Sequence, residues 1–115
     1  LASLTAINRE HSAKVIILVG EIDTVVWVKG KWSCEIPVGT RLSLWPLGEQ
    51  FFHSSTGLKY SLKDLTLHPL NLIGTSNETI KRKFSLHPSE NYSSRYVTII
   101  PSKYFLNLYN SLVGK

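Results

Sequence analysis

Residues 14–28 read KVIILVGEIDTVVWV and carry the strongest β-strand signal in the chain. Valine and isoleucine dominate this stretch, and their β-branched side chains fit a pleated sheet better than a helix. Gly20 interrupts the run, and an isolated glycine inside a strand pattern is typical of a bulge or a sharp bend. We therefore expect one long first strand that is bent at Gly20. Such a bend allows one strand to take part in both sheets of a small closed barrel.

Shorter strands are expected after this stretch. The segment 29–31 separates two apolar runs, which predicts a hairpin turn. Trp32, Cys34 and Ile36 alternate with polar residues and predict a half-buried strand. Residues 53–57 have the composition of a loop. Further strands are predicted at 42–45, 58–67 with a slip near residue 64, 79–86 and 95–100.

A single helix is expected at the C-terminal end. Pro101 ends the last strand, Ser102 is placed to cap a helix, and Gly114 is placed to close it. A short helical turn is also expected near residues 4–9. The pattern predicts a mainly β fold, a small barrel or a sandwich of about five to six strands with a C-terminal α-helix. Its architecture most resembles the five-stranded oligonucleotide-binding (OB) barrel, and this resemblance implies no site residue.

The length and composition predict one domain over residues 1–115. The chain is 43% hydrophobic and 18% charged, which argues against intrinsic disorder. Its longest apolar run, residues 15–19, is far shorter than the ~20 residues that a membrane-spanning helix needs. Cys34 is the single cysteine and has no partner for an internal disulfide, so we expect an intracellular protein.

The net charge of +5 comes entirely from the second half of the chain. Residues 1–57 hold five basic and five acidic side chains, whereas residues 58–115 hold eight basic and three acidic ones. Clustered basic side chains favour an anionic partner, and nucleic acid is the first candidate. The alternative is a solvated face that only keeps the domain soluble.

Basic residues interleaved with aromatic residues suggest how a nucleic acid would be bound. Aromatic rings stack on bases, and lysine and arginine contact phosphates, so single-stranded nucleic acid is favoured. The alternative for each ring is an ordinary place in the core. The predicted nucleic-acid-binding residues are Trp27, Lys29, Lys31, Lys59, Lys81, Arg82, Lys83 and Arg95.

A protein-protein interaction module is the alternative function. An adaptor, inhibitor or assembly subunit would dock through a sheet edge or through the apolar stripe of the C-terminal helix. That stripe contains Phe105, Leu108, Tyr109 and Leu112.

No motif of an enzyme or a metal site is apparent. Four scattered histidines and one cysteine do not form a zinc pattern, and the seven glycines form no phosphate-binding motif. Cys34 is expected to be a small buried apolar residue. Asn77 and Asn91 fit the N-glycosylation pattern, as chance allows in such a chain. We therefore expect a protein that is not an enzyme and has no cofactor and no metal.

Overall fold

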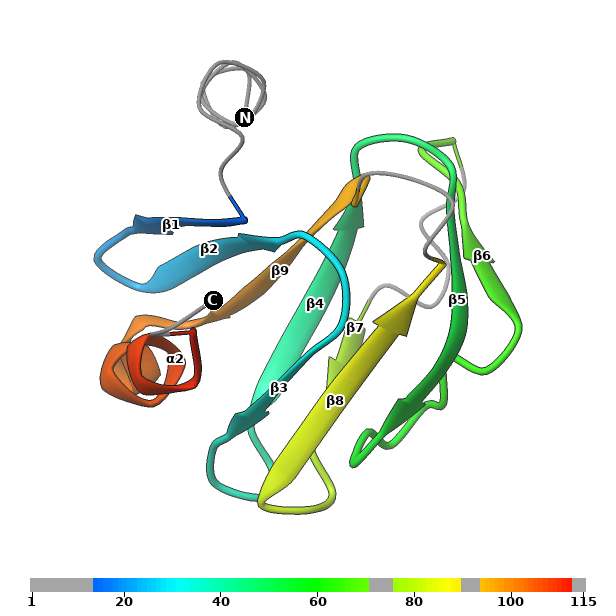
Figure 1. Cartoon of the computed structure of the whole chain (residues 1–115). Helices are drawn as coiled ribbons and strands as arrows, with labels where there is room; N and C mark the ends of the chain where they lie inside the picture. Colours follow the sequence, from blue (N-terminus) through cyan, green and yellow to red (C-terminus); the bar gives the residue numbers. More distant parts are fainter. Residues whose placement is uncertain (1–13, 71–75, 90–93, 113–115) are drawn as a thin grey trace.

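The computed structural model describes residues 14–70, 76–89 and 94–112. Two antiparallel sheets face each other, and Figure 1 shows them as two layers. The five-stranded sheet has the order β1(Val15–Val19), β2(Asp23–Val28), β9(Tyr96–Pro101), β4(Arg41–Pro46), β7(Ser76–Glu78). The four-stranded sheet has the order β3(Trp32–Glu35), β8(Lys83–Pro88), β5(Gln50–Thr56), β6(Leu65–Leu67). The mainly β fold class is confirmed.

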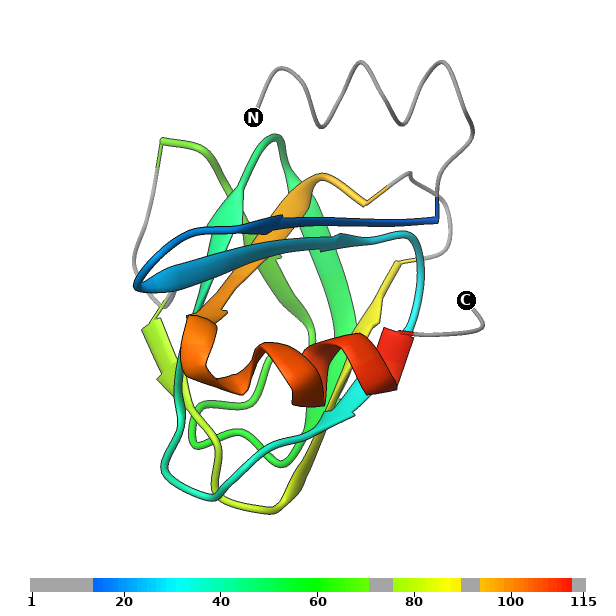
Figure 2. The ribbon, with the colours of Figure 1, turned by 90° about the vertical axis from the view of Figure 1, so that its left-hand side faces the viewer.

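A short 3-10 helix η1(Ser102–Tyr104) leads into the helix α2(Phe105–Leu112). Helix α2 packs on β3, and Figure 2 shows it crossing in front of the sheets, below the hairpin of β1 and β2. The predicted C-terminal helix is therefore confirmed. The helical turn expected at residues 4–9 and the closing Gly114 lie outside the described residues.

The core fills the space between the sheets. Buried leucines come from β4, where Leu42 and Leu44 are inaccessible to solvent. Aromatic rings meet edge to face: the Phe52 and Tyr96 rings lie 4.8 Å apart, and the Trp32 ring packs on Phe84 in the same way at 5.3 Å. Such pairs add about 0.5–1.5 kcal/mol each beyond the burial of apolar area.

The predicted bent first strand is wrong, because residues 14–28 form an antiparallel hairpin. Val19 of β1 lies opposite Thr24 of β2, and the backbone N–H of Gly20 donates to the carbonyl of Asp23 (2.9 Å). The hydroxyl of Ser102 donates to the carbonyl of Gly20 (2.7 Å) and lies 2.8 Å from that of Thr24. Ser102 therefore ties the hairpin to η1, whose N-cap is Pro101 with no side-chain capping bond, so the predicted cap is also wrong.

Three other local predictions need correction. Residues 29–31 do not close a hairpin, because β2 and β3 belong to different sheets and this segment connects them. Residues 58–62 contain no strand, only an isolated bridge from Leu58 to Thr79. Most of the loop expected at 53–57 instead belongs to β5, and the strand expected from residue 79 begins at Lys83. The division of the chain into one domain remains a prediction.

Among the described residues, no helix is both long and apolar enough to cross a membrane.

Candidate functional site

A loop covers the outer edge of β7, the last strand of the five-stranded sheet. We call residues 57–60 the Gly57 loop. The backbone N–H of Lys59 donates to the carbonyl of Glu78 (2.8 Å), and that of Ile80 donates to the carbonyl of Gly57 (2.8 Å). These bonds satisfy backbone groups that an edge strand would otherwise expose. The loop is thereby held in place without forming a strand.

Asn77 fixes the Gly57 loop through its side-chain amide. Its Oδ1 accepts hydrogen bonds from the backbone N–H groups of Tyr60 (3.0 Å) and Glu78 (2.9 Å), and its Nδ2 donates to the carbonyl of Tyr60 (2.8 Å). The residue is 4% exposed. From the sequence, Asn77 is only a match to the glycosylation pattern. A buried amide with three hydrogen bonds is a structural anchor and is not accessible to glycosylation.

Gly57 brings the loop against the first residues of β8. Its φ is +73°, a value that favours glycine, and a Cβ built there would collide with the carbonyl oxygen of Lys83. The same Cβ would lie 3.0 Å from the Cα of Phe84. The close approach of two backbones therefore requires glycine at this position.

Threonine hydroxyls link the end of β7, next to the Gly57 loop, to the segment before β4. The Thr79 Oγ1 accepts from the backbone N–H of Thr40 (2.9 Å) and donates to the carbonyl of Pro37 (2.9 Å). The Thr40 hydroxyl donates to the same carbonyl (2.6 Å). Both threonines are buried, so this network joins the segment before β4 rigidly to the end of β7.

The anchored backbone presents a small exposed surface, which we call the Tyr60 surface and define as Lys59, Tyr60, Ser76 and Glu78. The Tyr60 ring is 57% exposed, and the Lys59 Nζ lies 5.5 Å from its centroid. A cation, the Lys59 ammonium, thus already lies over this ring. Ser76 and Glu78 are exposed on β7, directly beside the loop. The surface combines an aromatic face, a hydroxyl and a carboxylate on a fixed backbone.

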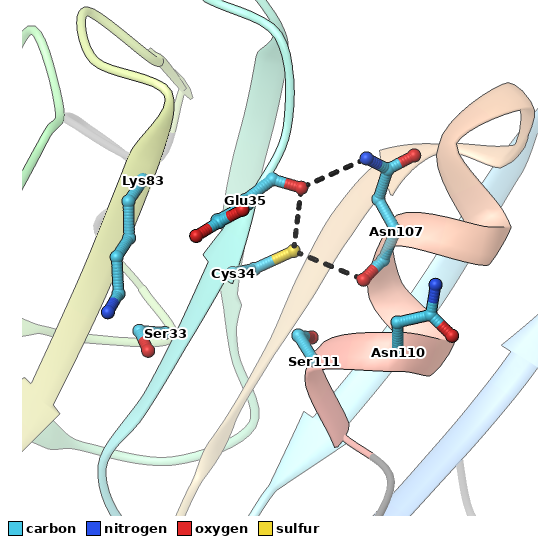
Figure 3. A pocket seen from close by; sticks show the side chains of 7 residues that line it. All are labelled: Ser33, Cys34, Glu35, Lys83, Asn107, Asn110 and Ser111. Atoms are coloured by element: carbon cyan, nitrogen blue, oxygen red, sulfur yellow. Dashed lines mark hydrogen bonds between the residues drawn. The ribbon is translucent and has the colours of Figure 1, made fainter.

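A cavity of about 370 Å³ lies between β3 and α2, shown in Figure 3. The Asn107 Nδ2 donates to the carbonyl of Glu35 (3.0 Å), and the Cys34 thiol lies 3.8 Å from the carbonyls of Glu35 and Asn107. Ser33 and Lys83 stand on the strand side of this cavity, and Ser111 stands on the helix side. These contacts fix the helix on the sheet.

Cys34 is expected to be unreactive in the native protein. Burial raises the pKa of its thiol, a hydrogen bond with Ser111 lowers it, and nearby Glu35 raises it again, with a net upward shift. Because the thiolate is the reactive form, alkylation by iodoacetamide at pH 8 should be slow and should accelerate on denaturation. Mass spectrometry of quenched samples measures both rates. Equal rates in native and denatured protein would contradict the burial of this thiol.

The predicted nucleic-acid-binding residues have different surroundings in the structure. Lys31 and Lys83 line a common cavity, whereas Arg82 lines a neighbouring one that also contains Glu35. Lys59 lies over Tyr60, and the Arg95 side chain packs on Gly48. Lys29 and Lys81 are exposed.

Several predicted contact residues are buried. Trp27 is 4% exposed, and its Nε1 donates to the carbonyl of Ser94 (2.8 Å), so its ring is not available for stacking on a base. Leu108 and Leu112 belong to the main core and are likewise unavailable to a partner. Tyr109 is 52% exposed, and its ring lies 6.1 Å from that of Phe105. Within the described ranges no cluster of three potential metal ligands occurs.

Both the sequence and the fold of the chain resemble those of known enzymes. Residues 34–87, just under half of the chain, match the family "Thiamin pyrophosphokinase, vitamin B1 binding domain". The structure resembles thiamine pyrophosphokinase from Bacillus subtilis with a TM-score of 0.68 and 17% identity over 88% of this chain. It also resembles the enzyme from Geobacillus thermodenitrificans with a TM-score of 0.62 and 16% identity over 88% of this chain. No curated protein sequence matches significantly.

The chain spans about half the length of these solved structures, 47% and 46% respectively. At such identities the structural likeness establishes the fold alone. The matched segment 34–87 contains the Gly57 loop, β7 and the threonine network.

These findings correct the functional predictions. The expectation of a non-enzymatic protein that binds nucleic acid, or that docks a protein partner, is wrong, because the matched family and both solved structures are thiamin pyrophosphokinases. Thiamin pyrophosphokinases are enzymes, and their name refers to the small molecule thiamin. Sequence reasoning missed the link between Tyr60 and Asn77, which lie 17 residues apart and are joined by hydrogen bonds in the folded chain.

Proposed function

We propose that this chain is the vitamin B1-binding part of a thiamin pyrophosphokinase and that it contacts thiamin. The observation that carries the proposal is the family match over residues 34–87, a segment that contains the hydrogen-bonded Gly57 loop. The likeness to two thiamine pyrophosphokinase structures over 88% of the chain supports it. The enzymatic activity of a whole protein and the intracellular location expected from the sequence are parts of the same proposal.

The Tyr60 surface is the proposed contact with the vitamin. Thiamin joins a permanently cationic thiazolium ring to an aminopyrimidine ring, so its recognition needs aromatic faces, a negative charge and hydrogen-bonding groups. Tyr60 remains 57% exposed although the Lys59 ammonium lies over its ring, and Glu78 offers a negative charge that offsets the charge of Lys59. Asn77 and Gly57 act as positioning residues that hold these groups in place.

Calorimetric titration of the chain with thiamin tests the proposal. Tyr60→Ala and Glu78→Gln should each weaken binding about fivefold, since a cation-π contact and an exposed charge pair each contribute about 1 kcal/mol. Tyr109→Ala and Glu49→Gln are matched controls, because Tyr109 is 52% exposed against 57% for Tyr60 and Glu49 is exposed on another loop.

The controls should bind thiamin as the unmodified chain does. Absence of thiamin binding would contradict the proposed function. Equal weakening by Tyr60→Ala and Tyr109→Ala would contradict the Tyr60 surface as its site.

A further inference from the structure

A second cavity, of about 580 Å³, lies over the outer face of the four-stranded sheet. We call it the outer-face cavity. Residues 83, 85 and 87 of β8 alternate with the buried Phe84, Leu86 and Pro88, so their side chains project to this outer face. The volume is within the range of small-molecule sites. Its polar lining consists of Lys31, Ser33, Thr56, Lys83, Ser85 and His87, with Ser111 of α2 at one side.

Three of these side chains form a continuous hydrogen-bonded row. The Thr56 Oγ1 lies 2.5 Å from the Ser85 Oγ, and the Ser85 Oγ lies 3.0 Å from the His87 Nε2. The row exists because Thr56 of β5 is directly opposite Ser85 in the register of β5 and β8. Hydroxyl and imidazole groups are therefore ordered before any ligand arrives, which reduces the entropy that binding costs.

The charged residues that line the outer-face cavity are basic, while Glu35 lies directly opposite Lys83 in the register of β3 and β8 and lines the adjoining cavity. Lys31 and Lys83 are basic, and none of the described residues that line the cavity is acidic. Lysine ammonium groups with serine and threonine hydroxyls are the usual donors to phosphate oxygens. Thiamin is a cation, which the two lysines of this cavity repel, so this cavity is unsuited to the vitamin.

We propose that the outer-face cavity binds the phosphoryl group of a small phosphorylated ligand. Lys83 supplies charge to the phosphate oxygens, together with Lys31. Thr56 donates its hydroxyl proton to the Ser85 Oγ and the His87 Nε2–H donates to the same oxygen, so that the Ser85 hydroxyl proton is left to be donated to a phosphate oxygen. This site does not depend on the proposed thiamin contact, because the two share no residue.

Calorimetric titration of the full 115-residue chain with inorganic pyrophosphate at low ionic strength tests this site. Lys83→Gln should weaken binding at least tenfold, and Ser85→Ala should weaken it several-fold. Lys63→Gln is the matched control, since it removes the same charge from an exposed residue that does not line this cavity, and it should leave binding unchanged. Thermal unfolding of each variant verifies that these surface changes leave the fold intact.

Two results would overturn the proposal. Equal weakening by Lys83→Gln and Lys63→Gln would show a general effect of net charge and no site. Sulfate that binds as tightly as pyrophosphate, with no response to Ser85→Ala, would show adventitious anion binding only. Titrations with inorganic phosphate and with pyrophosphate distinguish a single phosphoryl group from a diphosphate, and tighter binding of either one than of sulfate supports the site.

Discussion

Replacing Gly57 with alanine is expected to lower the free energy of unfolding by about 3–5 kcal/mol. Two costs combine at this position. Alanine disfavours the φ of +73°, and its Cβ would overlap the carbonyl oxygen of Lys83, which is backbone and cannot move aside by a rotamer change. The Gly57 loop would have to separate from β8, which would also displace Tyr60.

Gly30→Ala is the matched control for this prediction. Gly30 has a φ of +84°, but no atom lies within 4 Å of a Cβ built there. Only the conformational cost remains, about 1–2 kcal/mol. Equilibrium unfolding in urea measures both variants. Equal losses of stability would mean that the Gly57 loop does not press against β8.

Replacing Asn77 with alanine is expected to cost about 3 kcal/mol of stability, since three hydrogen bonds of a buried amide are lost and the backbone groups of Tyr60 are left without their partner. The Tyr60 amide hydrogen should also exchange faster with solvent. Urea unfolding and hydrogen exchange followed by NMR provide the two measurements.

Asn107→Ala is the control for Asn77→Ala, because Asn107 is exposed and its side chain makes one described hydrogen bond, to the Glu35 carbonyl. Its loss should cost less than about 1 kcal/mol. Two results together would contradict the anchoring role of Asn77. The Asn77 variant would be no less stable than the Asn107 variant, and the Tyr60 amide hydrogen would exchange at an unchanged rate.

Strands whose pattern is local were predictable from the sequence. The alternation of Trp32, Cys34 and Ile36 correctly predicts a strand with these three side chains buried, and the β-branched run at 96–100 correctly predicts β9. Each pattern reflects which side chains meet the core, and this depends little on the partner strand.

The connections between strands were less predictable. Gly20 fits a bulge and a turn equally well, and the hydrogen bond from its N–H to Asp23 selects the turn. Residues 58–62 alternate like a strand, yet their neighbour is the edge of β7, and the Asn77 side chain takes the place of regular backbone pairing. Such choices depend on partners that are distant in sequence, so composition does not reveal them.

The candidate site was only partly accessible from the sequence. The charge asymmetry pointed to Lys59 and Lys83, but the fold places them in different surroundings, one over an aromatic ring and one in the outer-face cavity. The charge count along the chain therefore identifies basic residues but not the neighbours that the fold gives each of them.

The NMR amide spectrum of the isotope-labelled chain, recorded during a thiamin titration, tests the central claim most directly. We predict that the amide signals of Lys59, Tyr60, Ser76 and Glu78 shift progressively, while those of Ser85 and His87 in the outer-face cavity stay unchanged. No shift at millimolar thiamin, or shifts that leave the Tyr60 surface unaffected, would contradict the account.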